Sequence, residues 1–350
     1  MNMKPLIIGD LKVRIPIIQG GMGVGISRWR LAGSVAKEGG IGIISTAQIG
    51  YDEPDFEKDP IKANLKAIKK HIDLARSIAD GGIVGVNIMV ATKQYESYIK
   101  AACMAGADVI ISGAGLPIKL PDLVKGYNTK IAPIVSSLRA ASIILKMWDK
   151  KYKRCADFIV VEGPRAGGHL GFTKEQLAGD LSDFDTSIKD IKNYIKVFEE
   201  KYQRKIPVIV AGGIYDRNDI KHALSLGADG VQISSRFVVT NECDASKEFK
   251  EAYINARKED IVIIDSPVGM PGRAVLTPFV KKVAKGKLPV KKCFNCLERC
   301  NPNEIPYCIT KALIEAVKGN IDEGLVFCGD NTHRLNKITT VKEIFEELVF

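Results

Sequence analysis

The sequence has no apolar run approaching the roughly 20 residues that a membrane-spanning helix requires. Its first residues, Met1-Asn-Met-Lys-Pro-Leu-Ile-Ile8, contain no basic segment followed by a long apolar stretch, so we expect no secretory signal peptide. These two absences predict a cytoplasmic protein that has no membrane partner.

The sequence also lacks basic blocks with interleaved aromatic residues, although its formal net charge is +10. Such blocks are typical of nucleic-acid interfaces, so nucleic acid is not an expected partner. Two explanations of the charge stay open: a lysine-rich surface that favours solubility, or attraction of anionic ligands such as nucleotides, coenzyme A or an acidic carrier protein.

Short apolar segments alternate with amphipathic stretches through about the first 260 of the 350 residues. Near-continuous β-branched runs are typical of parallel strands that are covered on both faces. The predicted strands are Ile15–Ile18, Gly42–Ser45, Val84–Asn87, Val109–Ser112, Ile131–Val135, Phe158–Val161, Val208–Ala211 and Gly230–Ile233. Eight βα units predict an α/β protein with a (β/α)8 TIM barrel, and a doubly wound open sheet is the alternative.

The spacing of these units predicts two parts of the chain. Residues 1–260 would form the barrel, and 170–206, after the sixth strand, would be an inserted lid that controls substrate choice. Residues 261–350 break the βα rhythm, so we expect a C-terminal extension there, with a cysteine cluster at 293–308.

The sixth predicted strand runs into a glycine-rich loop that ends at His169. Barrel enzymes place their chemistry on loops that follow strands, and imidazole titrates near neutral pH, so His169 is the candidate catalytic acid or base. A purely structural hydrogen bond is the alternative role. Glu162, at the end of the same strand, could bind a hydroxyl group, pair with Arg165 or tune a bound flavin.

The loops after the last two strands predict a phosphate site. Gly212 and Gly213 follow the seventh strand, and Gln232-Ile-Ser-Ser235 ends the eighth. In barrels these two loops often bind phosphate, because glycines allow backbone amides to approach it and serines add donors. Tight βα turns are the alternative explanation of the glycines.

Several segments together resemble the nitronate monooxygenase family, formerly called 2-nitropropane dioxygenases, which includes the flavin-dependent enoyl-acyl carrier protein reductase II. They occur in the same order over roughly residues 5–280 and are Gln19-Gly-Gly-Met22, Gly85-Val-Asn87, Glu162-Gly-Pro-Arg-Ala-Gly-Gly-His169, Ala211-Gly-Gly-Ile214 and Gly227-Ala-Asp-Gly-Val-Gln-Ile-Ser-Ser-Arg-Phe237.

The resemblance implies an FMN-binding barrel in which His169 is the catalytic histidine. The expected flavin-binding residues lie on the loops after the first, third, sixth, seventh and eighth strands. They are Gly21, Met22, Gly23, Asn87, Glu162, Gly167, Gly168, Gly212, Gly213, Gln232, Ile233, Ser234 and Ser235.

The chain departs from the family pattern at two positions. Glu162 stands where nitronate monooxygenases usually have glutamine, and this form looks more like the enoyl reductase branch. Ser234 stands where the family usually has glycine, so its Cβ alters how the phosphate would be held.

Four of the eight cysteines, Cys293, Cys296, Cys300 and Cys308, follow a C-x2-C-x3-C-x7-C spacing. Closely spaced thiols in a cytosolic chain suggest a soft metal centre rather than disulfides. The segment resembles the iron–sulfur cysteines of 2,4-dienoyl-CoA reductase barrels. A [4Fe–4S] cluster, a structural zinc and free thiols all stay open.

The predicted function is that of an FMN-dependent oxidoreductase that oxidises alkyl nitronates or a related small substrate. One alternative is an enoyl-thioester reductase fed by NAD(P)H or by the iron–sulfur centre, and another is a non-redox phosphate-binding barrel enzyme. The expected partners are a small-molecule or acyl-thioester substrate, an electron-transfer protein and a second copy of the chain as a homodimer.

Overall fold

The computed structural model describes residues 3–179 and 183–349. Eight parallel strands close into a barrel in the order β10-β11-β3-β4-β5-β6-β7-β8. The strands are β3 (Ile17–Gln19), β4 (Ile41–Ser45), β5 (Ile83–Met89), β6 (Val109–Gly113), β7 (Lys130–Val135), β8 (Ile159–Glu162), β10 (Val208–Ala211) and β11 (Gly230–Ile233). The TIM barrel and all eight strands predicted from the sequence are confirmed, with ends that differ from the predicted ones by at most two residues.

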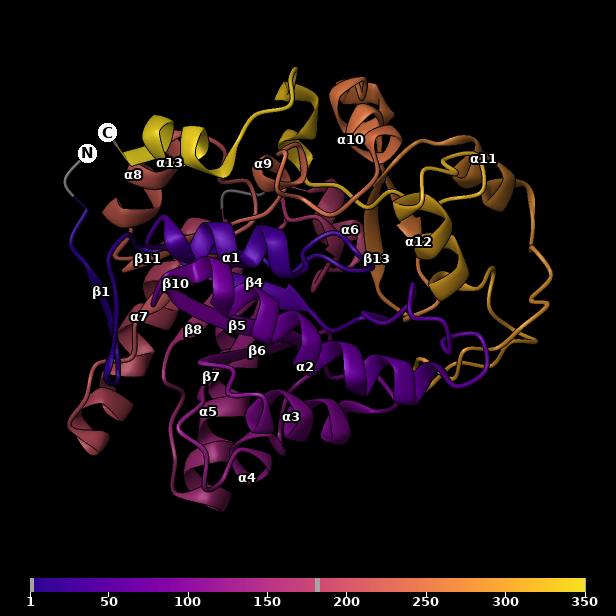
Figure 1. Cartoon of the computed structure of the whole chain (residues 1–350). Helices are drawn as coiled ribbons and strands as arrows, with labels where there is room; N and C mark the ends of the chain where they lie inside the picture. The colour runs from indigo at the N-terminus through magenta and orange to yellow at the C-terminus, as the bar shows by residue number, and fades with distance from the viewer. Residues whose placement is uncertain (1–2, 180–182, 350) are drawn as a thin grey trace.

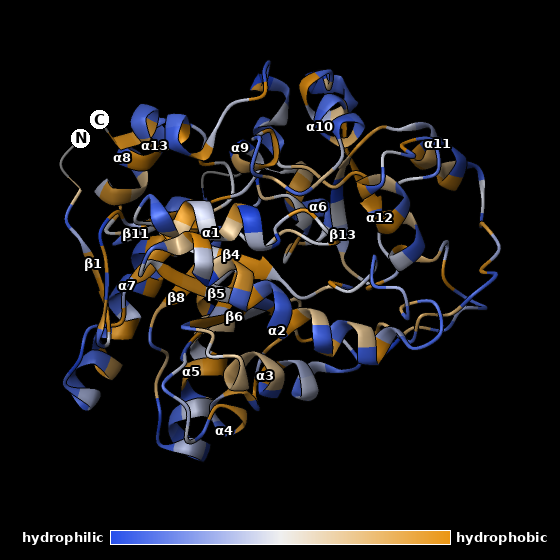
Figure 2. Cartoon of the chain, in the orientation of Figure 1, coloured by the Kyte–Doolittle hydropathy of each residue, from blue (hydrophilic) through white to orange (hydrophobic). Residues whose placement is uncertain are grey.

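Helices follow the strands and surround the barrel (Figure 1). They are α1 (Trp29–Lys37), α2 (Pro60–Ala79), α3 (Tyr95–Met104), α4 (Leu120–Leu123), α5 (Leu138–Tyr152), α7 (Asp183–Tyr202), α8 (Arg217–Ser225) and the short α9 (Ser235–Val238). Figure 2 shows mainly hydrophobic central strands and helices with mixed faces, as expected when each helix buries one side.

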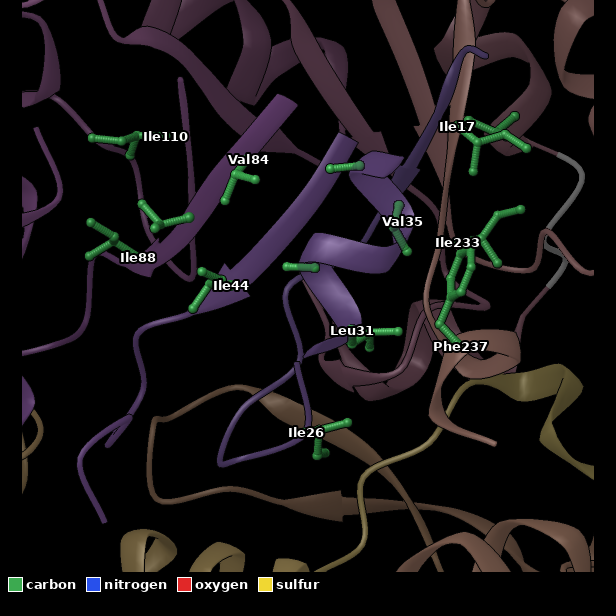
Figure 3. Close-up of a cluster of buried hydrophobic side chains, with 14 of the residues drawn as sticks. Ile17, Ile26, Leu31, Val35, Ile44, Val84, Ile88, Ile110, Ile233 and Phe237 are labelled. Carbon is green, nitrogen blue, oxygen red and sulfur yellow. The ribbon is translucent and has the colours of Figure 1, made fainter. Parts of the chain in front are cut away.

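Side chains along each strand alternate between two apolar layers. Ile41 and Ile43 point into the barrel, whereas Ile44 joins the larger layer between the strands and the helices. Figure 3 shows this outer layer, in which Leu31 and Val35 of α1 lie among strand residues.

An N-terminal hairpin, β1 (Leu6–Ile8) and β2 (Leu11–Val13), was not predicted from the sequence. Its residues Leu6, Ile8 and Val13 belong to the same apolar cluster as the inward-facing strand residues. Because the hairpin precedes β3, it covers the N-terminal end of the barrel, and the opposite end, where the strands finish, stays available for a site.

Only part of the segment predicted as a lid, residues 170–206, lies outside a barrel helix. Most of residues 170–206 form α7, whose Ile188, Ile191 and Ile195 are buried in the outer layer of the barrel. It is therefore the barrel helix that follows β8. The remaining loop carries only β9 (Gly168–His169) and α6 (Lys174–Ala178) before residues 180–182, which lie outside the described part.

Most of the residues after 238 add helices, a hairpin and irregular segments around the open end of the barrel, whereas the last helix lies beside α8 (Figure 1). Their elements are α10 (Lys247–Ile254), η1 (Lys258–Asp260), β12 (Ile261–Asp265), β13 (Pro271–Val275), α11 (Pro278–Lys285), α12 (Ile309–Val317), η2 (Asp330–Arg334) and α13 (Val341–Val349). β13 pairs with β12 and also with β9, so the extension joins the loop of the sixth strand in one small sheet.

The last helix completes the barrel. α13 contacts α1, α8 and α9, and its Phe345 and Leu348 are fully buried in the layer that surrounds the strands. Arg236 donates to Glu347 at 2.5 Å and ties α9 to α13. The extension predicted after residue 260 has an apolar cluster of its own, which includes Phe279 and Tyr307. Its last helix instead belongs to the barrel layer and occupies the place of the eighth barrel helix.

Candidate active site

A cavity of about 380 Å³ lies where the barrel strands end. Ligand pockets typically measure about 300–1,000 Å³, so it is large enough for a cofactor or a substrate portion. Each loop that follows a barrel strand contributes to its lining, as in barrel enzymes generally.

The cavity brings together most of the site residues predicted from the sequence. Besides His169 and Glu162, these are Gly21, Met22, Gly23, Asn87, Gly167, Gly168, Gly212, Gly213, Gln232, Ser234 and Ser235. Ile233 does not line it. Its side chain is buried in the outer layer near Phe237, because neighbouring residues of a strand face opposite sides (Figure 3).

Glycines keep the cavity open on two sides. A Cβ on Gly21 would lie 2.3 Å from the Cβ of Asn87, and one on Gly212 would lie 2.8 Å from the carbonyl oxygen of Gly163. Gly212 and Gly213 also have φ values of +88° and +92°, which residues with a side chain rarely adopt. The backbone can therefore approach a ligand here more closely than any larger residue would allow.

The polar groups that line the cavity suit a flat, hydrogen-bonding ring and an anionic tail. The side-chain amides of Asn87 and Gln232 line it and form no hydrogen bond with another described residue. Ser234 and Ser235 stand at the end of β11, and the side chain of Arg165 packs beside Gly213. These donors, together with the glycine-lined walls, fit an FMN molecule.

Arg236, which also belongs to the resembling segment, does not add charge to the cavity. Its side chain is buried, bonds Glu347 and donates to the carbonyl oxygen of Tyr215 at 2.9 Å. Arg165 supplies the exposed positive charge instead, with Asp330 at 3.9 Å.

His169 is held by a residue of the extension. Its Nε2 lies 2.7 Å from the hydroxyl oxygen of Ser266, and that oxygen accepts a hydrogen bond from the backbone amide of Val268 at 3.3 Å. The edge of its ring packs on Phe327, with 5.0 Å between the ring centroids. Burial lowers the pKa of His169 to about 4, so the imidazole is neutral at pH 7.

Glu162 faces the same cavity without a partner. Its carboxylate forms no hydrogen bond or ion pair with a described residue, and Arg165 turns to Asp330 instead. Burial raises the pKa of Glu162 to about 7. Near neutral pH the site thus holds a carboxylic acid that can give up a proton and a neutral imidazole that can donate a hydrogen bond.

A segment of the extension, residues 325–331, forms part of the cavity wall and is called the strap here. The backbone amide of Cys328 donates a hydrogen bond to the carbonyl oxygen of Arg273 at 3.0 Å. The side-chain amide of Asn331 donates one to the carbonyl oxygen of Gly213 at 2.7 Å. A Cβ on Gly167 would lie 2.6 Å from the carbonyl oxygen of Cys328, so this glycine permits the close approach. The strap thus covers part of the site, together with Gly171 from the start of the segment predicted as a lid.

Sequence reasoning missed the strap, Ser266 and Arg273. Arg273 is buried and donates to the carbonyl oxygens of Pro164 and Ala166, which braces the loop before His169. The loop Ser266-Pro-Val-Gly-Met-Pro-Gly-Arg273 was recognisable from its glycines and prolines, but nothing in the sequence indicated that it would meet His169.

The four clustered cysteines do not form a metal site as they stand. Cys293 is exposed and the other three are half-buried. Within residues 3–179 and 183–349, no three His, Cys, Asp or Glu side chains lie close enough together to hold a metal ion. In the same ranges, no helix is both long and apolar enough to cross a membrane.

The barrel, its glycine-lined cavity and the titratable pair at its centre define an enzyme of the TIM-barrel class. Comparison with known proteins identifies the family of this enzyme, because the nitronate monooxygenase family profile matches residues 4–350. The chain therefore belongs to the nitronate monooxygenase family and is a flavin-dependent oxidoreductase.

Individual relatives agree with this assignment. A probable nitronate monooxygenase of Staphylococcus aureus is 24% identical over 303 residues, which cover 80% of this chain and 81% of the relative. FabK of Thermotoga maritima superposes with a TM-score of 0.72 at 26% identity, over 96% of this chain and 92% of that one. The nitroalkane oxidase of Streptomyces ansochromogenes gives a TM-score of 0.72 at 16% identity, over 95% and 94%, and supports the fold alone.

Proposed function

We propose that the cavity binds FMN and that the enzyme reduces the C=C bond of an enoyl thioester, with NAD(P)H or a one-electron donor as the source of electrons. The observation that carries the proposal is Glu162, a carboxyl group in the cavity that has no partner within residues 3–179 and 183–349 and whose pKa burial raises to about 7. Reduction of an activated C=C bond consumes a proton, and this group can supply one. Glutamine, usual at this position in nitronate monooxygenases, could not.

The flavin would lie against the glycine loops. Gly21, Met22 and Gly23 would contact the ring, and Asn87 and Gln232 would bond its polar edge. Gly167 and Gly168 of the sixth loop would lie along the ring, while Gly212, Gly213, Ser234 and Ser235 would hold the phosphate. When bound, FMN supplies the hydride that such a reduction needs.

The chain's own residues would orient the substrate and move the proton. The neutral imidazole of His169 would donate a hydrogen bond to the thioester carbonyl oxygen and so polarise the conjugated double bond. Glu162 would give its proton to the carbon next to that carbonyl and regain it from solvent. The strap and Phe327 would limit the access of water to the reacting atoms.

Nitronate oxidation is the second candidate, because it is the activity for which the family is named. The same Glu162 argues against it, since an ionised carboxylate in the cavity would repel an anionic nitronate. The third candidate, a non-redox phosphate-binding barrel enzyme, disagrees with the family match, because the chain belongs to a family of oxidoreductases.

Two assays with the purified, FMN-loaded protein separate these activities. The proposal predicts oxidation of NAD(P)H, or of a chemically reduced one-electron dye, without oxygen when a short enoyl thioester is added. It also predicts that Glu162→Gln keeps its flavin but loses about a hundredfold or more in this rate, which is the typical contribution of a general acid. Release of nitrite from an alkyl nitronate in air, with no turnover of enoyl thioesters, would contradict it.

A further inference from the structure

The charged side chains of the cavity are confined to one part of its wall. Among the described residues these are Glu162, Arg165 and Asp330, which come from the end of β8, from the loop that follows it and from the strap. In the same part of the chain, the ends of β5, β6 and β7 and the loops after them contribute no charged side chain to the lining. A ligand portion that lies against these three loops therefore meets no fixed charge.

Apolar side chains form much of this uncharged part of the lining, which is called the neutral wall here. Each of them is half-buried and faces the cavity. The members of the neutral wall are Met89, Ala114, Leu116, Ile134 and Ala140. Gly113 makes room for it, because a Cβ at this position would lie 2.9 Å from the Cδ1 atom of Ile134.

Met89 is the member of the neutral wall that the hydrophobic core does not explain. It belongs to none of the four hydrophobic clusters of the described residues, although it is half-buried. It is the last residue of β5 and stands two positions after Asn87, so both side chains face the cavity and Met89 lies nearer the open end. A flexible apolar side chain in this position gains contacts when an apolar ligand enters.

The neutral wall lies across the mouth of the barrel from the loops proposed to hold the phosphate of the flavin. Four steps around the closed ring of strands separate β10 from β5, and four separate β11 from β6. Strands half a ring apart face each other, so a flavin bound by its phosphate at β10 and β11 would extend towards β5. Met89 would then lie on the side of the flavin ring that faces the open end.

The neutral wall also begins beside His169. β7 pairs with β8, and the loop after β8 carries His169. A Cβ on Gly171 would lie 2.3 Å from the hydroxyl oxygen of Ser136, so the loops that follow these two strands pack closely together. A substrate whose carbonyl oxygen bonds His169 can therefore extend the rest of its chain along the neutral wall.

We propose that the neutral wall binds the acyl chain of the substrate and that Met89 determines which chain length is preferred. The substrate class is a thioester of an extended apolar acyl chain. Each methylene group buried against the wall favours binding, whereas a charged chain would lose its hydration there without gaining a partner. The assignment rests on the proposed function, because it takes the thioester carbonyl group to lie at His169.

The test is the affinity of the full-length, FMN-loaded protein for butyryl-, hexanoyl- and octanoyl-CoA, measured by calorimetry. These thioesters share one head group and lack the double bond that the proposed reaction reduces, so only the length of the chain differs. We predict that the affinity rises about threefold with each added methylene group. Equal affinity for the three thioesters would overturn the assignment.

Variants of Met89 show whether this side chain sets the preference. Met89→Ala should weaken the binding of octanoyl-CoA about fivefold and that of butyryl-CoA less than about twofold, because a shorter chain does not reach the lost contact. Met89→Leu has a similar volume and should restore most of the affinity. Met104→Ala is the matched control, since Met104 is 76% exposed on α3 and does not line the cavity.

Two further outcomes separate this assignment from the proposed function. Reduction of enoyl thioesters at rates that do not depend on chain length, with Met89→Ala altering only the KM for NAD(P)H, would mean that the wall holds the nicotinamide and would overturn the assignment alone. Absence of turnover with every enoyl thioester would overturn the proposed function, whereas the calorimetric series would still test the wall. If Met89→Ala does not fold, the series on the unmodified protein decides.

Discussion

At the scale of single residues, the site depends on two titratable groups whose pKa values burial moves in opposite directions. Glu162 becomes a weaker acid and His169 a weaker base, so at neutral pH His169 is uncharged and Glu162 is present in both its protonated and its ionised form. Pairs of groups whose pKa values are displaced in this way commonly mark acid–base chemistry.

Replacement of Glu162 by glutamine should alter the pH dependence of stability of the flavin-free protein. The folded-state pKa is raised from 4.5 to about 7, so the contribution of Glu162 is complete below pH 4.5 and is lost as the pH rises through 7. Relative to Glu162→Gln, the unmodified protein should lose about 3 kcal/mol of unfolding free energy over this range. Urea unfolding of both proteins from pH 4.5 to 8 measures the difference.

His169 acts in the opposite sense, because its pKa is lowered from 6.5 to about 4 and its contribution is lost as the pH falls through that window. It is present in both proteins, so it cancels in the comparison. Parallel pH profiles for the two proteins would show that Glu162 titrates normally.

Ser266 should act as a positioning residue for His169. Because Ser266 accepts from Val268, its own hydroxyl hydrogen can point to Nε2, which leaves Nδ1 of the ring as the hydrogen-bond donor. Loss of a bond worth about 1 kcal/mol in Ser266→Ala should lower kcat about fivefold with little change in KM. Ser266→Thr keeps the hydroxyl and should restore most of the rate; equal loss in both variants would indicate a packing role.

At the scale of elements, the strap and the C-terminal helix complete the barrel: one covers loops of the cavity and the other packs between two barrel helices. The strap packs against the loops that carry Gly167 and Gly213, and α13 fills the gap between α1 and α8. Both come from the last part of the chain and meet loops that lie far away in the sequence.

Gly167→Ala should displace the strap. The new Cβ would lie 2.6 Å from the carbonyl oxygen of Cys328, so backbone has to move, at a cost of about 1–3 kcal/mol in stability together with weaker flavin binding. Gly179→Ala is the matched control, because its Cβ would meet its nearest neighbour at an ordinary 3.5 Å and its φ of −87° is permitted. Fluorescence titration with FMN and thermal unfolding compare them; equal behaviour would mean that the strap tolerates the contact.

Phe345→Ala should destabilise the whole barrel. Phe345 is 1% exposed and packs on Phe237, with 6.1 Å between the ring centroids, so its removal should cost about 3–5 kcal/mol. Ile338→Ala, at a position 37% exposed just before the helix, should cost less than about 1 kcal/mol. Chemical denaturation measures both, and a small loss for Phe345→Ala would show that α13 is dispensable.

At the scale of the whole molecule, the barrel was predictable because each β-branched run is buried on both faces and is followed by an amphipathic helix. The glycine loops and His169 were predictable for a related reason, since loops that follow barrel strands meet at one end. Ile233 was grouped with the expected flavin-binding residues because a motif names neighbours together, whereas its side chain lies in the outer layer, since a strand turns alternate residues to opposite faces.

The extension was the least predictable part, because its contacts are long-range. Ser266 meets His169 across 97 residues and Asn331 meets Gly213 across 118, and no local pattern encodes such pairs. The helix inside the segment predicted as a lid was hard to place for a similar reason. The amphipathic pattern of α7 marks a helix, but only the fold shows that its apolar face lies on the barrel and not over the site.

The claim that joins these scales is that the glycine-lined cavity at the end of the barrel holds one FMN, and its most direct test is the flavin content of the purified full-length chain. We predict a yellow protein that releases about one FMN per chain on denaturation, or takes it up from solution with micromolar or tighter affinity. A colourless protein that binds no added FMN would contradict the account.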